Sequence, residues 1–300
     1  IYNYLKSLGL EVWYQDFMVT VPVNYGAKVV ILSPDEGEIT AYPLLPNLAV
    51  PVATPDEGIT GELVYVGEGE LPDFEGKNVK GNIVLMDFNS GRNWINAAKF
   101  GAKAVIFIAP GDTTYKEVED KYLQIPFKFN RLYVSAEDGQ KLLSLLEKGP
   151  VKVKVVAKSR WEERPTKNVI ALLKGRKEDI VQFSSYYDSI SVVIDIAPGA
   201  QEAIGASILM EVARILSQET PAYTILFTFF SGHDQAVAGS RKFVEEYGFG
   251  AYASTIGKRI RLQINLDIST GTDVLTSFWP SPLSGIIDTP PGAKKGGPPH

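Results

Sequence analysis

The second half of the sequence alternates short apolar runs with helical patterns, and this alternation constrains the fold more than any other feature. Residues 203–218 carry apolar side chains at helical spacing, and SRKFVEEYG predicts another helix. Strands that alternate with helices favour an α/β fold with a mixed, largely parallel sheet sandwiched by helices. The predicted strands are NVIALLKG, DIVQFSSYYDS, YTILFTFFSG and IRLQINLDIS, which begin at Asn168, Asp179, Tyr223 and Ile260.

The first half has a different texture, in which short β-branched runs such as KVVILS and GNIVLMDF are separated by turn residues. Two helices are expected there, NWINAAKFGA and SAEDGQKLLSLLEKG, the second capped by Ser135 with Asp138 three residues later. The charged stretch RWEERPTK lacks an apolar period and is interpreted as a linker. We therefore predict an N-terminal helix and strand packing on the second domain (1–26), a β-rich domain (27–159), a linker (160–167), an α/β domain with an incomplete sheet (168–275) and a Pro/Gly-rich tail (276–300).

Composition excludes several classes of function. A hydrophobic content of 45% with 22% charged residues is typical of a globular protein, and a net charge of -5 disfavours nucleic acid as a partner. The sequence contains no cysteine, so disulfides, thiolate metal sites and cysteine nucleophiles are excluded. No apolar run approaches the length of a membrane span.

Polar signatures follow three of the predicted strands: SSYYDS, FFSGHD and INLD. Ligands of parallel α/β sheets bind beyond the carboxyl ends of the strands. We therefore expect a site that brings these three segments together.

In order and spacing, the segments from TKNVIALLKG through PGAQEAIGAS and TFFSGHDQAVAGS to INLD resemble the M28 family of zinc aminopeptidases. The preceding segment, with GNIVLMDF and NAAKFGAKAVIFI, resembles the protease-associated (PA) domain that accompanies such peptidases. The resemblance implies a two-zinc hydrolase that releases N-terminal residues from peptides, with a glutamate as the general base. It also implies an extracellular or cell-surface location.

The resemblance assigns roles to particular positions, and several hold other residue types than the family does. Tyr186 stands at the first histidine ligand. The resemblance assigns catalytic positions to Asp188 and His233, of which His233 stands at the glutamate base. Three carboxylates match further metal-ligand positions: Glu202 at the bridging aspartate, Asp234 at a glutamate ligand and Asp267 at an unchanged aspartate. The only other histidine is His300, in the tail, so the last histidine ligand of the family is not found.

Two hypotheses remain open. In the first, these residues are remnants of a pocket, hydrogen-bonded to each other and to water, with Tyr186 a packed aromatic beside Tyr187. The chain is then a non-catalytic homologue without a cofactor, a binding or structural ectodomain with a protein partner or a second copy of itself. In the second, imidazole and carboxylates hold an altered zinc site and the chain is an aminopeptidase acting on peptides. We predict that it does not hydrolyse peptides by the family's two-zinc mechanism. We also predict that a strand near INLDIS is unpaired along one edge, and that another chain or a further segment covers this edge.

Overall fold

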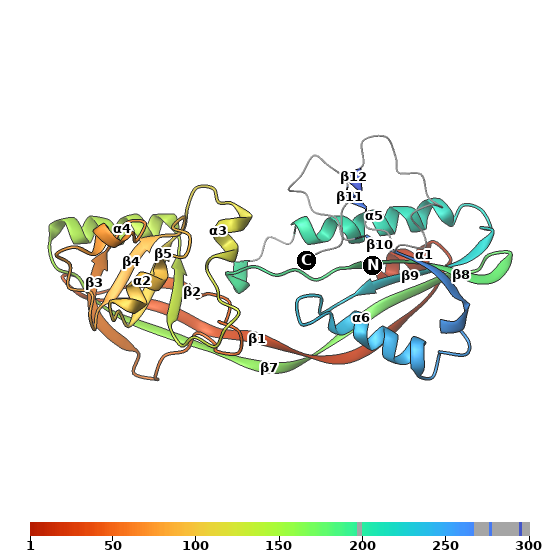
Figure 1. The fold of residues 1–300 in the computed structure, drawn as a ribbon, viewed down its shortest axis with the longest axis horizontal. Helices are drawn as coiled ribbons and strands as arrows, with labels where there is room; N and C mark the ends of the chain where they lie inside the picture. The colour runs from red at the N-terminus through yellow and green to blue at the C-terminus, as the bar shows by residue number, and fades with distance from the viewer. Residues whose placement is uncertain (197–199, 267–275, 278–293, 296–300) are drawn as a thin grey trace.

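A long two-stranded ribbon joins two lobes (Figure 1). The computed structural model describes residues 1–196, 200–266, 276–277 and 294–295, with side chains described for 1–196 and 203–266. The ribbon consists of β1 (Glu11–Ser33) and β7 (Lys152–Leu173), which pair antiparallel along nearly their whole lengths. One end of the ribbon belongs to the barrel lobe, within residues 27–157, and the other end to the sandwich lobe, formed by residues 1–23, 166–188 and 200–266. The segment after β8 returns to the barrel lobe, where Val192 and Val193 are buried and Val193 forms a bridge with Leu44.

The predicted linker is part of this ribbon. Residues 160–167 form strand β7 and pair with residues 16–23 of β1, and the boundary predicted between residues 26 and 27 also lies within β1. The segment interpreted as a linker thus connects the two lobes as a paired strand, which the sequence did not predict. Nearly all side chains of 160–167 are exposed or half-buried, so the strand has no apolar face that the sequence could reveal. The limits of the domains themselves stay a prediction.

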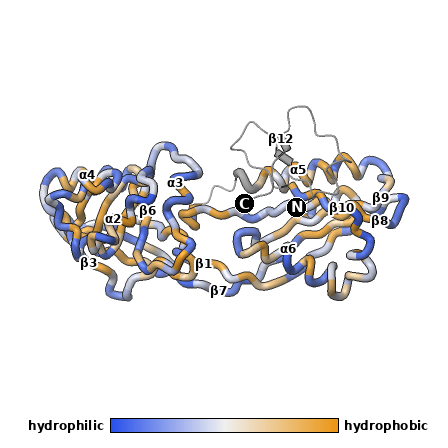
Figure 2. Tube along the Cα trace, viewed as in Figure 1, coloured by the Kyte–Doolittle hydropathy of each residue, from blue (hydrophilic) through white to orange (hydrophobic). Residues whose placement is uncertain are grey.

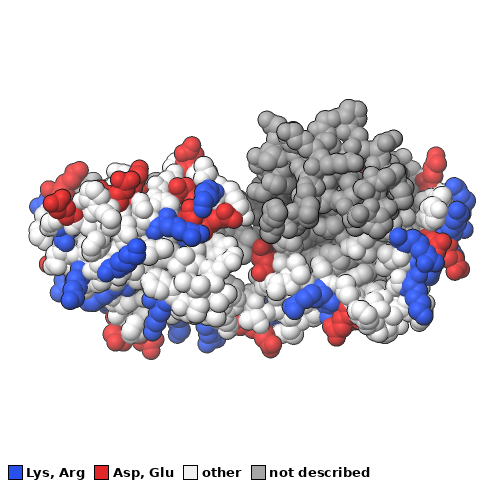
Figure 3. All heavy atoms as spheres, viewed as in Figure 1, with Lys and Arg blue, Asp and Glu red and all other residues white. Residues whose placement is uncertain are grey.

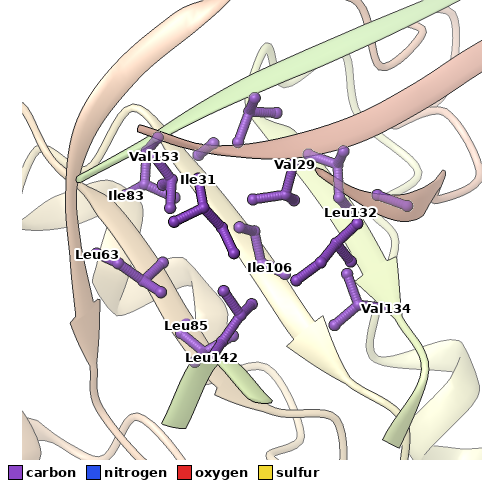
Figure 4. Packing of buried hydrophobic residues seen from close by; sticks show 14 of the residues in the cluster. Val29, Ile31, Leu63, Ile83, Leu85, Ile106, Leu132, Val134, Leu142 and Val153 are labelled. Atoms are coloured by element: carbon purple, nitrogen blue, oxygen red, sulfur yellow. The ribbon is translucent and has the colours of Figure 1, made fainter. Parts of the chain in front are cut away.

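The barrel lobe is a closed ring of strands. Its order is β1-β2-β6-β5-β4-β3-β7, and the β1–β7 pairing closes it. Apolar side chains from all these strands and from one helix fill the interior, among them Ile31, Leu85, Ile106 and Leu142 (Figure 4). The remaining elements are β2 (Gly37–Pro43), β3 (Ile59–Tyr65), η1 (Leu71–Phe74), β4 (Ile83–Asp87), α2 (Trp94–Lys99), β5 (Ala104–Ile108), α3 (Tyr115–Glu119), β6 (Asn130–Val134) and α4 (Ala136–Lys148).

The sandwich lobe is a mixed sheet with helices on both faces, which confirms the predicted fold class. Strand β8 lies between β9 and β10 and is parallel to both, whereas β7 is antiparallel to β9. One apolar cluster joins Leu5 and Leu209 to one face, and another joins Phe243 and Tyr247 to the other. The elements of this lobe are α1 (Tyr2–Ser7), β8 (Lys177–Tyr186), α5 (Ala200–Leu216), β9 (Tyr223–Phe230), α6 (Ala238–Phe243), η3, a π-helix (Val244–Phe249), η4 (Gly257–Arg259) and β10 (Ile260–Asn265). The chain also contains η2 (Ile194–Ile196), after the segment that packs on the barrel lobe, and a separate pair of short strands, β11 (Thr276–Ser277) and β12 (Lys294–Lys295).

The hydropathy of the chain follows this architecture. Figure 2 shows apolar residues concentrated in the strands inside each lobe. Figure 3 shows Lys and Arg interspersed with Asp and Glu over the visible face of the described residues, as expected for a protein of small net charge. No helix among the described residues is long and apolar enough to span a membrane.

A buried lysine organises the barrel lobe next to its apolar core. Lys121 is fully buried, and its Nζ donates to the Gly91 carbonyl at 2.9 Å and to Glu117 Oε2 at 3.0 Å. Asp120 accepts from the side chains of Lys116 and Arg92 at 2.6 and 2.8 Å. These contacts hold α3 against the loop that contains Gly91 and Arg92.

This cluster predicts acid sensitivity of the barrel lobe. The hydrogen bond from Lys116 lowers the pKa of Asp120 below its ordinary value of 3.8, against the opposing effect of burial. Burial alone would raise the pKa of Glu117, but hydrogen bonds from the Gly91 amide and Lys121 lower it below 4.5. A carboxyl group whose pKa is lowered by folding stabilises the protein above its unfolded pKa, and this stability is lost as the pH falls through the folded pKa. We expect the free energy of unfolding, measured with urea, to decrease from about pH 5 downward.

The substitution Asp120→Asn should flatten this pH dependence, because the amide does not titrate. Asp56→Asn is the matched control, since Asp56 is an exposed carboxylate of the same lobe for which no ion pair is found among the described residues. A pH dependence that is the same in both variants would contradict the assignment.

Candidate functional site

The carboxyl ends of β8, β9 and β10 meet at one edge of the sandwich sheet. Tyr186 is in register with Phe230, and Ser184 with Asn265. The segments that follow these strands carry Asp188, His233 and Asp234. The structure thus brings two of the three predicted polar signatures together. Asp267 and His300 lie outside the described residues, as does the side chain of Glu202, which belongs to α5.

The Asp188 carboxylate holds the loop after β9. Its Oδ2 accepts hydrogen bonds from the backbone N–H groups of Gly232 and His233, at 2.7 and 3.0 Å. Its Oδ1 is buried and has no hydrogen-bond partner among the described residues. A buried carboxylate oxygen favours a polar neighbour, such as a water molecule or a cation. Asp188 therefore fixes the loop and leaves one oxygen available for a ligand.

Tyr186 stacks on His233 and not on Tyr187. The two ring centroids are 4.1 Å apart and the ring planes are inclined by 19°. Tyr187 points to the other face of the sheet, where burial raises the pKa of its phenol and its hydroxyl donates to the Lys167 carbonyl at 2.6 Å. Tyr186 is thus a packed aromatic, as one hypothesis expected, but its partner is the half-buried imidazole of His233. The stacking fixes the plane of that imidazole.

Asn168 is a positioning residue that sequence reasoning missed. It is fully buried at the start of the sandwich part of β7. Its Nδ2 donates to Gln15 Oε1 at 2.8 Å and to the Gly239 carbonyl at 2.9 Å, and its Oδ1 accepts from the Ser231 N–H at 3.1 Å. The loop that carries His233 and Asp234 is therefore held at both ends. In the sequence, the one feature that could have indicated this role is a single amide residue, Asn168, directly before the apolar run VIALL.

Two glycines serve close packing and turning at this edge. A Cβ on Gly205 would lie 2.5 Å from Ser185 Oγ and 2.7 Å from the Leu266 carbonyl oxygen, so α5 approaches the strand ends without room for a side chain. Gly232 has φ +71°, in the left-handed region that favours glycine.

The described residues do not fit two zinc ions. No three His, Cys, Asp or Glu side chains among them lie close enough to hold a metal. The first histidine position is occupied by a phenol that packs on an imidazole, and neutral tyrosine is a poor zinc ligand. The unpartnered Asp188 Oδ1 is the one described feature that favours a cation here.

Comparison with protein families agrees with the architecture. Residues 168–288 match the model of peptidase family M28, and residues 59–142 match the model of the PA domain. Among solved structures, the chain is similar to a zinc aminopeptidase from Bacillus subtilis, BSAP, with a TM-score of 0.56 and 21% identity, covering 88% of this chain and 60% of the other. A peptidase M28 precursor from Shewanella amazonensis SB2B gives a TM-score of 0.56 with 20% identity, covering 82% and 60%. These two likenesses show the fold.

Curated relatives include aminopeptidases. The chain is 26% identical to aminopeptidase YwaD of Bacillus subtilis (strain 168) over 243 residues, covering 77% of this chain and 49% of the relative. It is 30% identical to a probable leucine aminopeptidase 2 of Aspergillus oryzae over 138 residues, covering 45% and 26%. The chain thus spans about half or less of the length of these relatives. Together, the matches confirm that the chain joins a PA domain, residues 59–142, to a segment of peptidase family M28, residues 168–288.

Proposed function

We propose that the chain is part of an aminopeptidase that releases N-terminal residues from peptides through a metal site different from that of the two-zinc enzymes. The observation that carries the proposal is the edge of the sandwich sheet, where Asp188 holds the loop that presents His233 and Asp234. The aminopeptidase relatives support the same reaction class. An extracellular or cell-surface location is part of this proposal.

In this arrangement the described residues have separate roles. His233 stands where the family places its general base, and histidine is the commonest side chain for that task. Stacking on Tyr186 and the amide contact to Asp188 limit the motion of His233. Asp234 is exposed next to it and stands at the position of a metal-ligating carboxylate of the family. The unpartnered Oδ1 of Asp188 is the oxygen that a peptide ammonium group or a cation would contact.

A second candidate function is favoured by the Tyr186–His233 stack itself. A phenol packed on an imidazole at 4.1 Å is a stable aromatic contact without a catalytic role. A chain built in this way would bind a peptide or a protein partner without hydrolysis, as a non-catalytic ectodomain. The edge of the sheet at β10 is its candidate surface for a partner or a second copy, because β10 is the outermost strand of the described sheet.

The two candidates differ in metal-dependent turnover. We expect the chain, incubated with zinc, cobalt or manganese, to release product from aminoacyl anilides. The rate should fall about 100-fold or more in His233→Ala, which removes the base, and in Asp234→Asn. Glu211→Gln is the matched control, because it removes a carboxylate from the exposed surface of α5, paired there only with Arg214 among the described residues.

Turnover that persists in His233→Ala would contradict the assigned base. Absence of turnover with every metal would overturn the aminopeptidase proposal and leave the non-catalytic candidate. That candidate predicts that the chain binds a peptide, which calorimetry would measure.

A further inference from the structure

A groove of about 800 Å³ runs between the two lobes and reaches the candidate site at Asp188 and Asp234. Its floor is the ribbon, where Met18 and Trp161 contribute exposed apolar surface. One wall is the strand-end edge with Asp188 and Asp234, and the other is the barrel lobe with Leu48. We propose that this groove binds the part of a peptide that follows its first residue, and that Leu48 selects an apolar side chain there. The inference rests on the proposed function and deepens it by assigning to Leu48 the selection of a side chain beyond the first residue of the peptide.

Backbone strain is concentrated at this groove. Within the described part of the chain, the non-glycine residues with positive φ are Leu48 at 48°, Ala236 at 54° and Val237 at 51°. Leu48 lines one wall of the groove and Ala236 the other, and Val237 follows Ala236 directly. Such conformations are costly for residues with a Cβ atom and persist where the surroundings enforce them, most often at functional sites.

The barrel lobe enforces the conformation of Leu48 with several hydrogen bonds. Asn47 is fully buried, and its amide donates to the Phe127 carbonyl and accepts from the Leu123 N–H, each at 2.9 Å. The Leu48 N–H donates to the Leu123 carbonyl at 3.0 Å, and Trp161 Nε1 of the ribbon donates to the Ala49 carbonyl at 2.9 Å. Despite these restraints, the Leu48 side chain is 55% exposed. The turn thus holds an apolar side chain at the surface of the groove.

Charge complementarity identifies a peptide as the occupant. The groove is lined by the carboxylates Asp188 and Asp234 and by the guanidinium groups of Arg164 and Arg241. Within the described residues, Arg241 forms no ion pair. Arg164 is already paired with Glu162, whereas Asp188 Oδ1 has no hydrogen-bond partner among the described residues. A short peptide carries an ammonium group at one end and a carboxylate at the other, for which Asp188 and Arg241 are counterparts of opposite charge. Because the strand-end edge is continuous with the groove, a peptide bound there by its N-terminus would extend along the ribbon toward Leu48.

The test is the substitution Leu48→Asn, because asparagine adopts positive φ more readily than leucine but lacks the apolar side chain. The ligand is a peptide of about eight residues with leucines after the second position, free termini and a reduced first peptide bond that cannot be cleaved. We expect calorimetry to show about tenfold weaker binding to Leu48→Asn. The unfolding temperature should rise by about 2 °C, because the strain is relieved.

Two comparisons make the result specific. Leu71→Asn is the matched control, since Leu71 is an exposed leucine of the barrel lobe outside the groove. This variant should bind the peptide as tightly as the parent chain, and its unfolding temperature should not rise. The variant Met18→Ser removes apolar surface from the groove floor without a change at the strained turn and should also weaken binding.

The outcomes separate this inference from the proposed function. Weaker binding with a raised unfolding temperature supports the groove. Unchanged affinity in Leu48→Asn and Met18→Ser, or no binding by the parent chain, overturns it. Turnover of aminoacyl anilides, which lack the further residues of a peptide, tests the aminopeptidase proposal independently of both results.

Discussion

Replacement of Asn168 by alanine is expected to lower the free energy of unfolding by about 3 kcal/mol, measured by urea denaturation. The substitution leaves the Ser231 N–H, the Gly239 carbonyl and Gln15 Oε1 without the partners that the Asn168 amide supplies. A buried polar group without a partner costs about 1–3 kcal/mol. The loop that carries His233 loses its anchor at both ends, so any turnover of the chain should fall as well.

The control for this prediction is Asn89→Ala in the barrel lobe. The Asn89 amide donates to the Asp112 carbonyl at 2.9 Å and accepts from Thr113 at 2.7 Å, but both contacts are exposed to water. Its removal should cost less than about 1 kcal/mol, because water replaces the lost partners. If both variants lost the same free energy of unfolding, the burial of the Asn168 amide would not explain its contribution to stability.

Much of the fold could be predicted because its elements have one apolar face or a buried run. The run YTILFTFF forms β9 with the same bounds, Tyr223–Phe230. Ser135 caps α4 as expected, with its Oγ accepting from the Asp138 N–H at 3.0 Å. In both segments, local sequence and tertiary environment favour the same structure.

The ribbon could not be predicted in this way. Residues 160–167 are stabilised by backbone pairing with β1 and not by the burial of a face, so their sequence is charged and carries no period. Strand β1 likewise continues through both lobes, and the predicted boundary at residue 26 coincides only with a local irregularity in its pairing with β7, between Asn24 and Ala27.

The candidate site was predictable in position and less so in contacts. The strand ends at Tyr186 and Phe230 are adjacent because parallel strands share an edge, which the alternation of elements implies. That Tyr186 stacks on His233, and that Asp188 binds two loop amides, depends on side-chain rotamers and loop geometry. No periodicity encodes these features.

Replacement of Gly205 by alanine should lower the free energy of unfolding by about 2 kcal/mol, although helix propensity alone favours alanine by about 1 kcal/mol. The new Cβ would lie 2.5 Å from Ser185 Oγ and 2.7 Å from the Leu266 carbonyl oxygen, so α5 must shift away from the strand ends. Ser207→Ala, at an exposed position of the same helix, should change stability by less than about 0.5 kcal/mol. Ser185→Ala in the Gly205→Ala background removes one of the two close contacts and should restore part of the loss, which a double-mutant cycle measures. A Gly205→Ala variant more stable than the parent would mean that α5 does not pack this tightly, and that the strand-end edge has room that the structure does not show.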